Sequence, residues 1–339
     1  MFRFYHFLTN SFLILLTGLT FQATSQAVTF QNLYGSDKAG FGLASNYSGG
    51  HLLAGTYEFQ ADSFALHLID VDSLGDTNWT RTYRGPSGLG AYLTRAADSG
   101  YIVTKKKKKN YLSLIATRID SNGNVLWNLE FPNIVADFSG LAIERTPTDE
   151  YIMAGATDQY DNNNRLDVII TKINDLGQRI WTRTFGTGNN EDDFAYDITV
   201  DQNGNYIIVG KTKNSNDEDY GFAMAVNANG DSLWTRYYED FEPRSVKPSD
   251  NGGLIVGGVY GSFTAENKLD AGLAKMDSDG IIEWAKAYGG AEDDYLTAIA
   301  NDNTGGYIIA GGTNSYGSGD TDIYFIRTDM NGDTSWTKT

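Results

Sequence analysis

Each of the six tryptophans closes the same short motif, and this repetition restricts the chain to a repeat fold. A Gly stands four residues before every Trp, and an Asp or Asn stands three residues before that Gly. The pairs are Gly75 and Trp79, Gly123 and Trp127, Gly177 and Trp181, Gly230 and Trp234, Gly280 and Trp284, and Gly332 and Trp336. Successive copies lie about 50 residues apart, and a fixed period of this size is typical of propellers and other repeat arrays.

One copy of the repeat can be divided into four short β-strands. Between Trp234 and Glu283 the strands are WTRYY, RSVKP, GLIVGGV and DAGLAKM, and clusters of Gly, Asn, Asp and Ser separate them. DSDG then leads into the next Trp strand. It favours a tight hairpin, because Asp277 can bond to its own turn and Gly280 can take a positive φ. Four strands per period predict an all-β fold, a β-propeller with six four-stranded blades in this chain.

A cation lies between two aromatic residues on one face of several Trp strands. Side chains alternate along a strand, so Trp284, Lys286 and Tyr288 point the same way. Such a group can form a ligand cage, but it recurs in several blades. We therefore interpret it as packing of the aliphatic stem of the cation over the rings.

The N-terminus has the layout of a secretory signal peptide. Arg3 is followed by an apolar run over residues 12–21 and by small residues at Ala23, Ser25 and Ala27. The run is shorter than the roughly 20 residues that span a bilayer. We expect residues 1–26 to be removed on export, and residues 27–339 to form a propeller that is secreted or displayed at the cell surface, without a membrane span.

The blades are expected to end near residues 84, 132, 186, 239, 290 and 339. The segment FQNLY, residues 30–34, aligns with the Trp strands but has no blade of its own. We expect an untruncated protein to contain further repeats, so that this strand closes a seventh blade.

The repeated block carries a family resemblance. GGYIIAGGTNSYGSGDTDIYFIRTDMNGDTSW and WAKAYGGAEDDY resemble the Gly-rich propeller repeats of proteins that gram-negative bacteria export by type IX secretion. More distantly, the hairpin with Asp, Gly and Trp is similar to the tryptophan-docking motif of quinoprotein propellers. That resemblance implies that the Trp strand is the outermost strand of its blade. The spacing is one residue shorter than in that family, so we predict no quinone cofactor.

Charge and composition exclude several functions. The net charge of −17 repels phosphate backbones and so excludes nucleic acid as a partner. With no cysteine, the chain has no disulfide, thiolate metal site or cysteine nucleophile. The run from Lys105 to Lys109 has the opposite charge. We interpret it as an exposed charged turn, with polyanion binding as the alternative.

Two sets of acidic loops are expected on one face of the propeller, after the Trp strands and after the second strand of each blade. The first set contains Asp192, Asp193, Asp293 and Asp294. The second supplies the metal candidates Asp217, Asp219, Asp320 and Asp322. Calcium binds six to eight oxygen ligands, so such loops are candidates for a calcium site. No loop matches the twelve-residue calcium pattern, so we interpret the face as a solvated surface and keep calcium as the alternative.

The sequence contains no catalytic motif. It has no Gly-rich phosphate loop, hydrolase nucleophile elbow or zinc motif, and we predict no catalytic residue. We therefore expect a monomeric binding or scaffold module for an extracellular glycan or protein. The alternative is a carbohydrate-active or quinone-type enzyme on the same fold.

Overall fold

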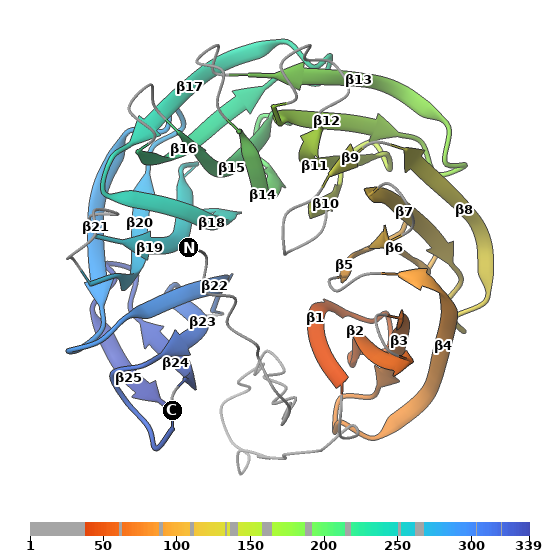
Figure 1. The fold of residues 1–339 in the computed structure, drawn as a ribbon, viewed down its shortest axis with the longest axis horizontal. Coiled ribbons are helices and arrows are strands. Elements are labelled where there is room, and N and C mark those ends of the chain that lie inside the picture. Colours follow the sequence, from red (N-terminus) through yellow and green to blue (C-terminus); the bar gives the residue numbers. More distant parts are fainter. Residues whose placement is uncertain are drawn as a thin grey trace.

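Six antiparallel sheets stand around a common centre in the computed structural model (Figure 1), which confirms the predicted all-β propeller. The structure describes residues 38–60, 63–87, 91–108, 112–132, 134–135, 142–157, 165–186, 192–213, 218–249, 252–261, 268–302, 304–319 and 321–339. The expected signal peptide and the FQNLY segment lie outside these residues. Within them, no helix is long and apolar enough to cross a membrane.

The strands follow the chain from the centre outward in every blade. Blade 1 contains β1 (Lys38–Ser45), β2 (His51–Gln60), β3 (Ser63–Val71) and β4 (Thr77–Ser87). Blade 2 contains β5 (Ala91–Arg95), β6 (Tyr101–Lys108), β7 (Leu112–Ile119) and β8 (Val125–Pro132). Blade 3 contains β10 (Ala142–Arg145), β11 (Tyr151–Thr157), β12 (Asp167–Ile173) and β13 (Arg179–Phe185), and the short β9 (Ile134–Val135) pairs with β11.

The other three blades have the same order of strands. Blade 4 contains β14 (Phe194–Val200), β15 (Tyr206–Lys213), β16 (Asp219–Val226) and β17 (Ser232–Tyr238). Blade 5 contains β18 (Phe241–Pro248), β19 (Leu254–Tyr260), β20 (Asp270–Met276) and β21 (Ile282–Tyr288). Blade 6 contains β22 (Asp294–Asn301), β23 (Tyr307–Thr313), β24 (Asp322–Thr328) and β25 (Thr334–Lys338). Each Trp therefore lies on an outermost strand, as the quinoprotein resemblance implied.

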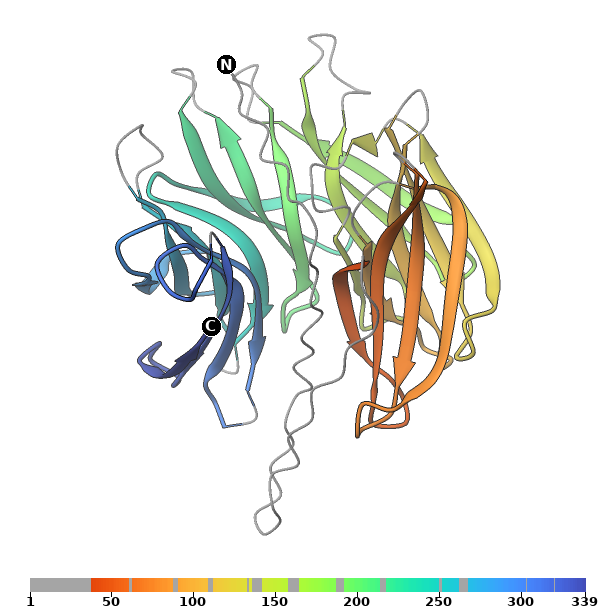
Figure 2. The ribbon, with the colours of Figure 1, turned by 60° about the horizontal axis from the view of Figure 1, so that its bottom comes forward.

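The apolar core is divided among the interfaces between neighbouring blades. The strands of each sheet run side by side, and successive sheets from blade 1 to blade 6 pack face to face (Figure 2). Between blades 4 and 5, for example, Ile207 and Val209 of β15 pack in one cluster with Val246 of β18 and Val256 of β19. Burial of these apolar faces holds successive blades together.

The repeated Asp and Gly form the hairpin that the sequence predicts. In blade 5, Asp277 Oδ1 accepts hydrogen bonds from the backbone N–H groups of Asp279 (2.9 Å) and Ile281 (2.8 Å). Gly280 has a φ of 76°, which is the left-handed region that favours glycine. The motif thus links the third strand of a blade tightly to its Trp strand.

The Trp of each of blades 1 to 5 docks on the Gly hairpin of the next blade. The indole N–H of Trp79 donates to Ser121 O at 3.1 Å, and that of Trp234 donates to Ser278 O at 3.1 Å. Trp127 and Trp181 donate to the equivalent carbonyls of Asp175 and Ala228. A Cβ on Gly280 would lie 2.7 Å from the Trp234 ring, so the hairpin needs glycine for this contact as well as for its φ.

Cations of other Trp strands pack on the rings, which confirms the packing interpretation there, whereas Lys286 pairs with Asp333 of the next blade. The guanidinium group of Arg236 lies 6.0 Å from the centroid of the Trp234 ring, and that of Arg81 lies 5.7 Å from the Trp79 ring. Tyr238 completes the docking by donating its hydroxyl to Gly280 O at 2.8 Å. The bond from Tyr238 thus connects its blade to the next.

The lysine run is only partly as expected. Lys105 to Lys108 belong to strand β6, and Lys109 lies outside the described residues. Lys105 is 8% exposed, and burial lowers its pKa. The interpretation as an exposed turn is therefore wrong for Lys105, because β6 continues through this position and turns its side chain into the sheet interface.

Substitution of Gly280 by Ala tests the docking contact against Gly204→Ala. Both glycines have positive φ, but a Cβ at Gly204 would meet no atom within 4 Å. The two variants share the backbone strain, whereas only Gly280→Ala pushes against the Trp234 ring. We expect Gly280→Ala to lower the free energy of unfolding by about 1–3 kcal/mol more than Gly204→Ala. Equal losses in urea unfolding would contradict the docking role.

Candidate functional site

A charged cluster connects the inner strands of blades 3, 4 and 5. Glu144 lies on β10, Asp197 on β14 and Lys247 on β18. These strands contact one another in sequence and are the innermost strands of their blades (Figure 1). The cluster thus lies beside the centre of the ring, where propeller blades meet.

Irregularities in two strands aim the cluster across the blade interface. The register of β14 on β15 shifts between Ala195 and Asp197, and that of β18 on β19 shifts between Pro243 and Ser245. A bulge of this kind redirects the side chain that follows it. Asp197 Oδ2 consequently reaches blade 5, where it accepts hydrogen bonds from Ser245 Oγ (3.1 Å) and Val246 N (2.9 Å).

One ammonium group lies between the two carboxyl groups. Lys247 Nζ is 3.4 Å from Asp197 Oδ2. Burial alone would lower the pKa of Lys247, but the charges of Asp197 and Glu144 outweigh it and raise this pKa. Burial raises the pKa of Glu144, and the opposing effect of Lys247 does not cancel it. Glu144 therefore keeps its proton to a higher pH than an ordinary glutamic acid does.

Further polar side chains lie beyond this cluster on the inner strands of blades 5 and 6. Arg244 Nε donates to Glu242 Oε1 at 2.8 Å within β18. Tyr295 of β22 follows, and burial raises its pKa while the nearby Arg244 acts in the opposite direction. The inner strands of blades 3 to 6 thus carry carboxyl, cationic and phenol side chains.

The fold itself does not require charge at these positions. Glu144 and Lys247 pair with Ile152 and Ile255, and the equivalent inner-strand positions of blades 4 and 6 hold Thr199 and Ala300. We missed the cluster in the sequence because its members are on strands about 50 residues apart. An alignment of the repeats would have given a signal, because charged residues stand in blades 3 and 5 where other blades have small or neutral residues.

The two predicted metal candidates that the structure describes lie in different blades. Asp219 and Asp322 begin the third strands of blades 4 and 6, while Asp217 and Asp320 lie outside the described residues. Asp322 Oδ2 accepts hydrogen bonds from Ser318 N (2.8 Å) and Gly319 N (3.2 Å), so it caps its own loop. Among the residues that the structure describes, no group of three or more Asp, Glu, His or Cys side chains is placed to hold a metal.

The acidic loops are only partly a solvated surface. Glu239 and Asp240 are exposed, but Asp193 is 2% exposed and Asp294 is 0% exposed. The interpretation as a solvated surface is therefore wrong for Asp193 and Asp294. Both lie where an inner strand begins beneath the loop of the preceding blade, as shown by the bonds from Asp193 N to Leu166 O and from Asp294 N to Leu269 O.

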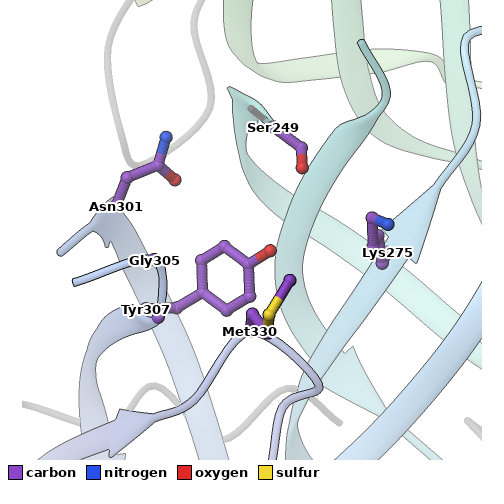
Figure 3. A pocket seen from close by; sticks show the side chains of 7 residues that line it. Ser249, Lys275, Asn301, Gly305, Tyr307 and Met330 are labelled. Carbon is purple, nitrogen blue, oxygen red and sulfur yellow. The ribbon is translucent and has the colours of Figure 1, made fainter. Parts of the chain in front are cut away.

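A small pocket lies between blades 5 and 6, at the end of the blades that carries the Gly hairpins. It is lined by Ser249, Lys275, Asn301, Gly305, Gly306, Tyr307 and Met330 (Figure 3). Lys275 and Tyr307 lie on the two neighbouring blades of this pocket. Lys172 and Tyr206 hold the equivalent positions between blades 3 and 4, where Lys172 Nζ is 5.8 Å from the centroid of the Tyr206 ring. The pocket is thus one version of a repeated blade interface, and it has no chemistry beyond that of the repeat.

The raised pKa of Glu144 gives a pH prediction. A raised folded-state pKa adds stability that is fully present below the unfolded pKa, near 4.5, and is lost as the pH rises through the folded pKa. Glu144→Gln removes this dependence. We expect the Tm of the variant minus that of the parent protein to increase from about pH 4 to about pH 8. Glu239→Gln is the control for loss of an exposed carboxyl group, and a pH-independent difference for Glu144→Gln would contradict the assignment.

Comparisons with known proteins give the fold and no family. No family model and no curated protein matches the chain. A protein of unknown function from Bacteroides caccae is similar in structure, with a TM-score of 0.50 and 15% identity over 85% of this chain and 93% of the other. A polysaccharide lyase of family PL25, an ulvan lyase, has a TM-score of 0.57 and 10% identity over 88% and 80% of the two chains.

An α-L-arabinanase from Penicillium chrysogenum, complexed with arabinobiose, is also similar. Its TM-score is 0.55, with 10% identity over 86% of this chain and 92% of the arabinanase. At such identities these likenesses establish architecture alone. The chain is a six-bladed β-propeller, similar in fold to carbohydrate-active enzymes and to a protein of unknown function.

Proposed function

We propose that the protein is exported and binds a neutral extracellular glycan at the charged cluster of its inner strands. The observation that carries this proposal is the meeting of Glu144, Asp197 and Lys247 beside the centre of the ring. The layout of residues 1–26 and the resemblance to type IX exported repeats support export.

The cluster matches the chemistry of sugar hydroxyls. Lys247 donates hydrogen bonds, Asp197 accepts them, and a protonated Glu144 does both. The side chain of Lys247 is 35% exposed and that of Asp197 is 14% exposed, so Lys247 is the more accessible of the two side chains. Hydroxyl groups are both donors and acceptors, and a mixed cluster can therefore satisfy them.

Charge and architecture narrow the ligand class. The net charge of −17 opposes the approach of polyanions, which favours a neutral glycan over a sulfated or uronic-acid polymer. Propellers of the same architecture include an arabinanase complexed with arabinobiose and a polysaccharide lyase. This analogy supports a glycan as the ligand class, but architecture alone does not specify function.

Binding to immobilised neutral and anionic polysaccharides tests the proposal, with Lys247→Met as the key variant. Methionine keeps most of the stem and removes the charge, so we expect about tenfold weaker binding of the neutral glycan. Lys338→Met on the outermost strand β25 is the matched control and should bind like the parent protein. Failure of the parent protein to bind any glycan, or equal binding by both variants, would contradict the proposal.

The raised pKa of Glu144 favours a second candidate, cleavage of the bound glycan with Glu144 as the proton donor. Release of reducing sugar from the polysaccharide that binds is the direct assay. A cleaving enzyme should lose this activity in Glu144→Gln while keeping the glycan bound. Binding without product release would leave the protein as a binding module.

A further inference from the structure

Two aspartates meet at the interface of blades 5 and 6, at the end of the ring opposite the Gly hairpins. Asp270 begins β20, and Asp294 begins β22. Gly289 lies between them, and a Cβ on this glycine would overlap both Asp270 Oδ1 and Asp294 Oδ2. The two carboxyl groups therefore converge on one point, which only glycine leaves open.

This pair has oxygen atoms without any partner. Asp294 is 0% exposed, and its Oδ2 accepts hydrogen bonds from Gly290 N (2.9 Å) and Ser315 Oγ (2.7 Å). Its Oδ1 is buried with no hydrogen-bond partner, and the same holds for Asp270 Oδ1. In the part of the chain that the structure describes, no cation pairs with either residue, and the nearby Lys268 pairs with Glu292 at 3.6 Å.

Such an arrangement is unfavourable unless something positive joins it. Two neighbouring carboxylates repel each other, and burial of an unpaired carboxylate costs several kcal/mol. Proteins avoid this cost with a proton, a cationic side chain or a metal ion. Both unpartnered atoms are carboxylate oxygens, and Ser315 Oγ bonds to the other oxygen of Asp294, so the surroundings are those that a hard divalent cation prefers.

Part of this arrangement recurs between blades 3 and 4, at Asp167, Gly186 and Asp193. The backbone bonds match: Asp193 N donates to Leu166 O at 2.6 Å, as Asp294 N donates to Leu269 O at 2.7 Å. A Cβ on Gly186 would overlap Asp167 Oδ1. Between blades 4 and 5, in contrast, Phe241 takes the position of the second aspartate, so the pairing is not required by the fold.

We propose that Asp270 and Asp294 bind a divalent cation of the calcium type between blades 5 and 6. Water and main-chain oxygens would complete the shell of six to eight ligands. Two carboxylates per ion predict a modest affinity, with a Kd of about 10⁻⁴ to 10⁻³ M, as in extracellular calcium modules. The ion would link the two neighbouring blades.

Thermal unfolding of the full chain in calcium and in EGTA tests the proposal. We expect millimolar calcium to raise the Tm by about 2 °C or more, because it binds only the folded state. Asp270→Asn should abolish this shift. Asp240→Asn is the matched control, since Asp240 is exposed at the interface that carries Phe241, and it should keep the full shift.

Terbium luminescence gives a readout that does not depend on stability. Tyr316 donates its hydroxyl to Gly289 O at 2.7 Å, so a terbium ion between Asp270 and Asp294 would be close enough to be sensitised by this tyrosine. We expect a signal that calcium displaces and that Asp270→Asn removes. A Tm independent of calcium together with no terbium signal would overturn the proposal. So would a calcium shift that survives in Asp270→Asn. A Tm that rises only on acidification would show that a shared proton, and no metal, joins the pair.

Discussion

The contact of the indole of blades 1 to 5 with the Gly hairpin of the next blade sets the geometry on which the rest of the propeller depends. The hairpin needs glycine twice, for its positive φ and for the space that the ring of Trp234 fills at Gly280. The indole N–H also satisfies a hairpin carbonyl. One small residue and one large residue thus fix the spacing of blades at the outer edge, and the inner strands are brought together as a result.

The sequence was sufficient for the parts of the fold that local chemistry determines. The period, the four strands and the hairpin around Asp277 all follow from patterns within a few residues. The contact of Trp234 with Gly280 spans 46 residues of sequence between neighbouring blades, so no local pattern could reveal it. Burial of Asp294 was missed for a related reason: the loop with Ser315 covers it, and its own acidic segment resembles a solvated surface.

The charged cluster of the inner strands could be recognised in the sequence only by comparing equivalent positions of the repeats. Thr199 and Ala300 occupy the equivalent positions in other blades, so the repeat folds without charge there. Burial of Glu144 and Lys247 in such a place costs desolvation energy, which mutual attraction only partly offsets. Proteins commonly accept such local costs at functional sites. This is why departures from the repeat, and not the repeat itself, indicate where the chain differs from a plain scaffold.

The Trp docking is directional, because the donor surface of one blade meets a different surface of the next. Interfaces of this head-to-tail type are heterologous, and they can in principle be extended by any number of identical units. Stability then divides into contributions of single blades and of nearest neighbours. Gain or loss of one unit of about 50 residues would leave every remaining junction with the same contacts. The Trp and Gly hairpin motif therefore determines how neighbouring blades join, whereas the curvature of the packed sheets determines how many blades complete a circle.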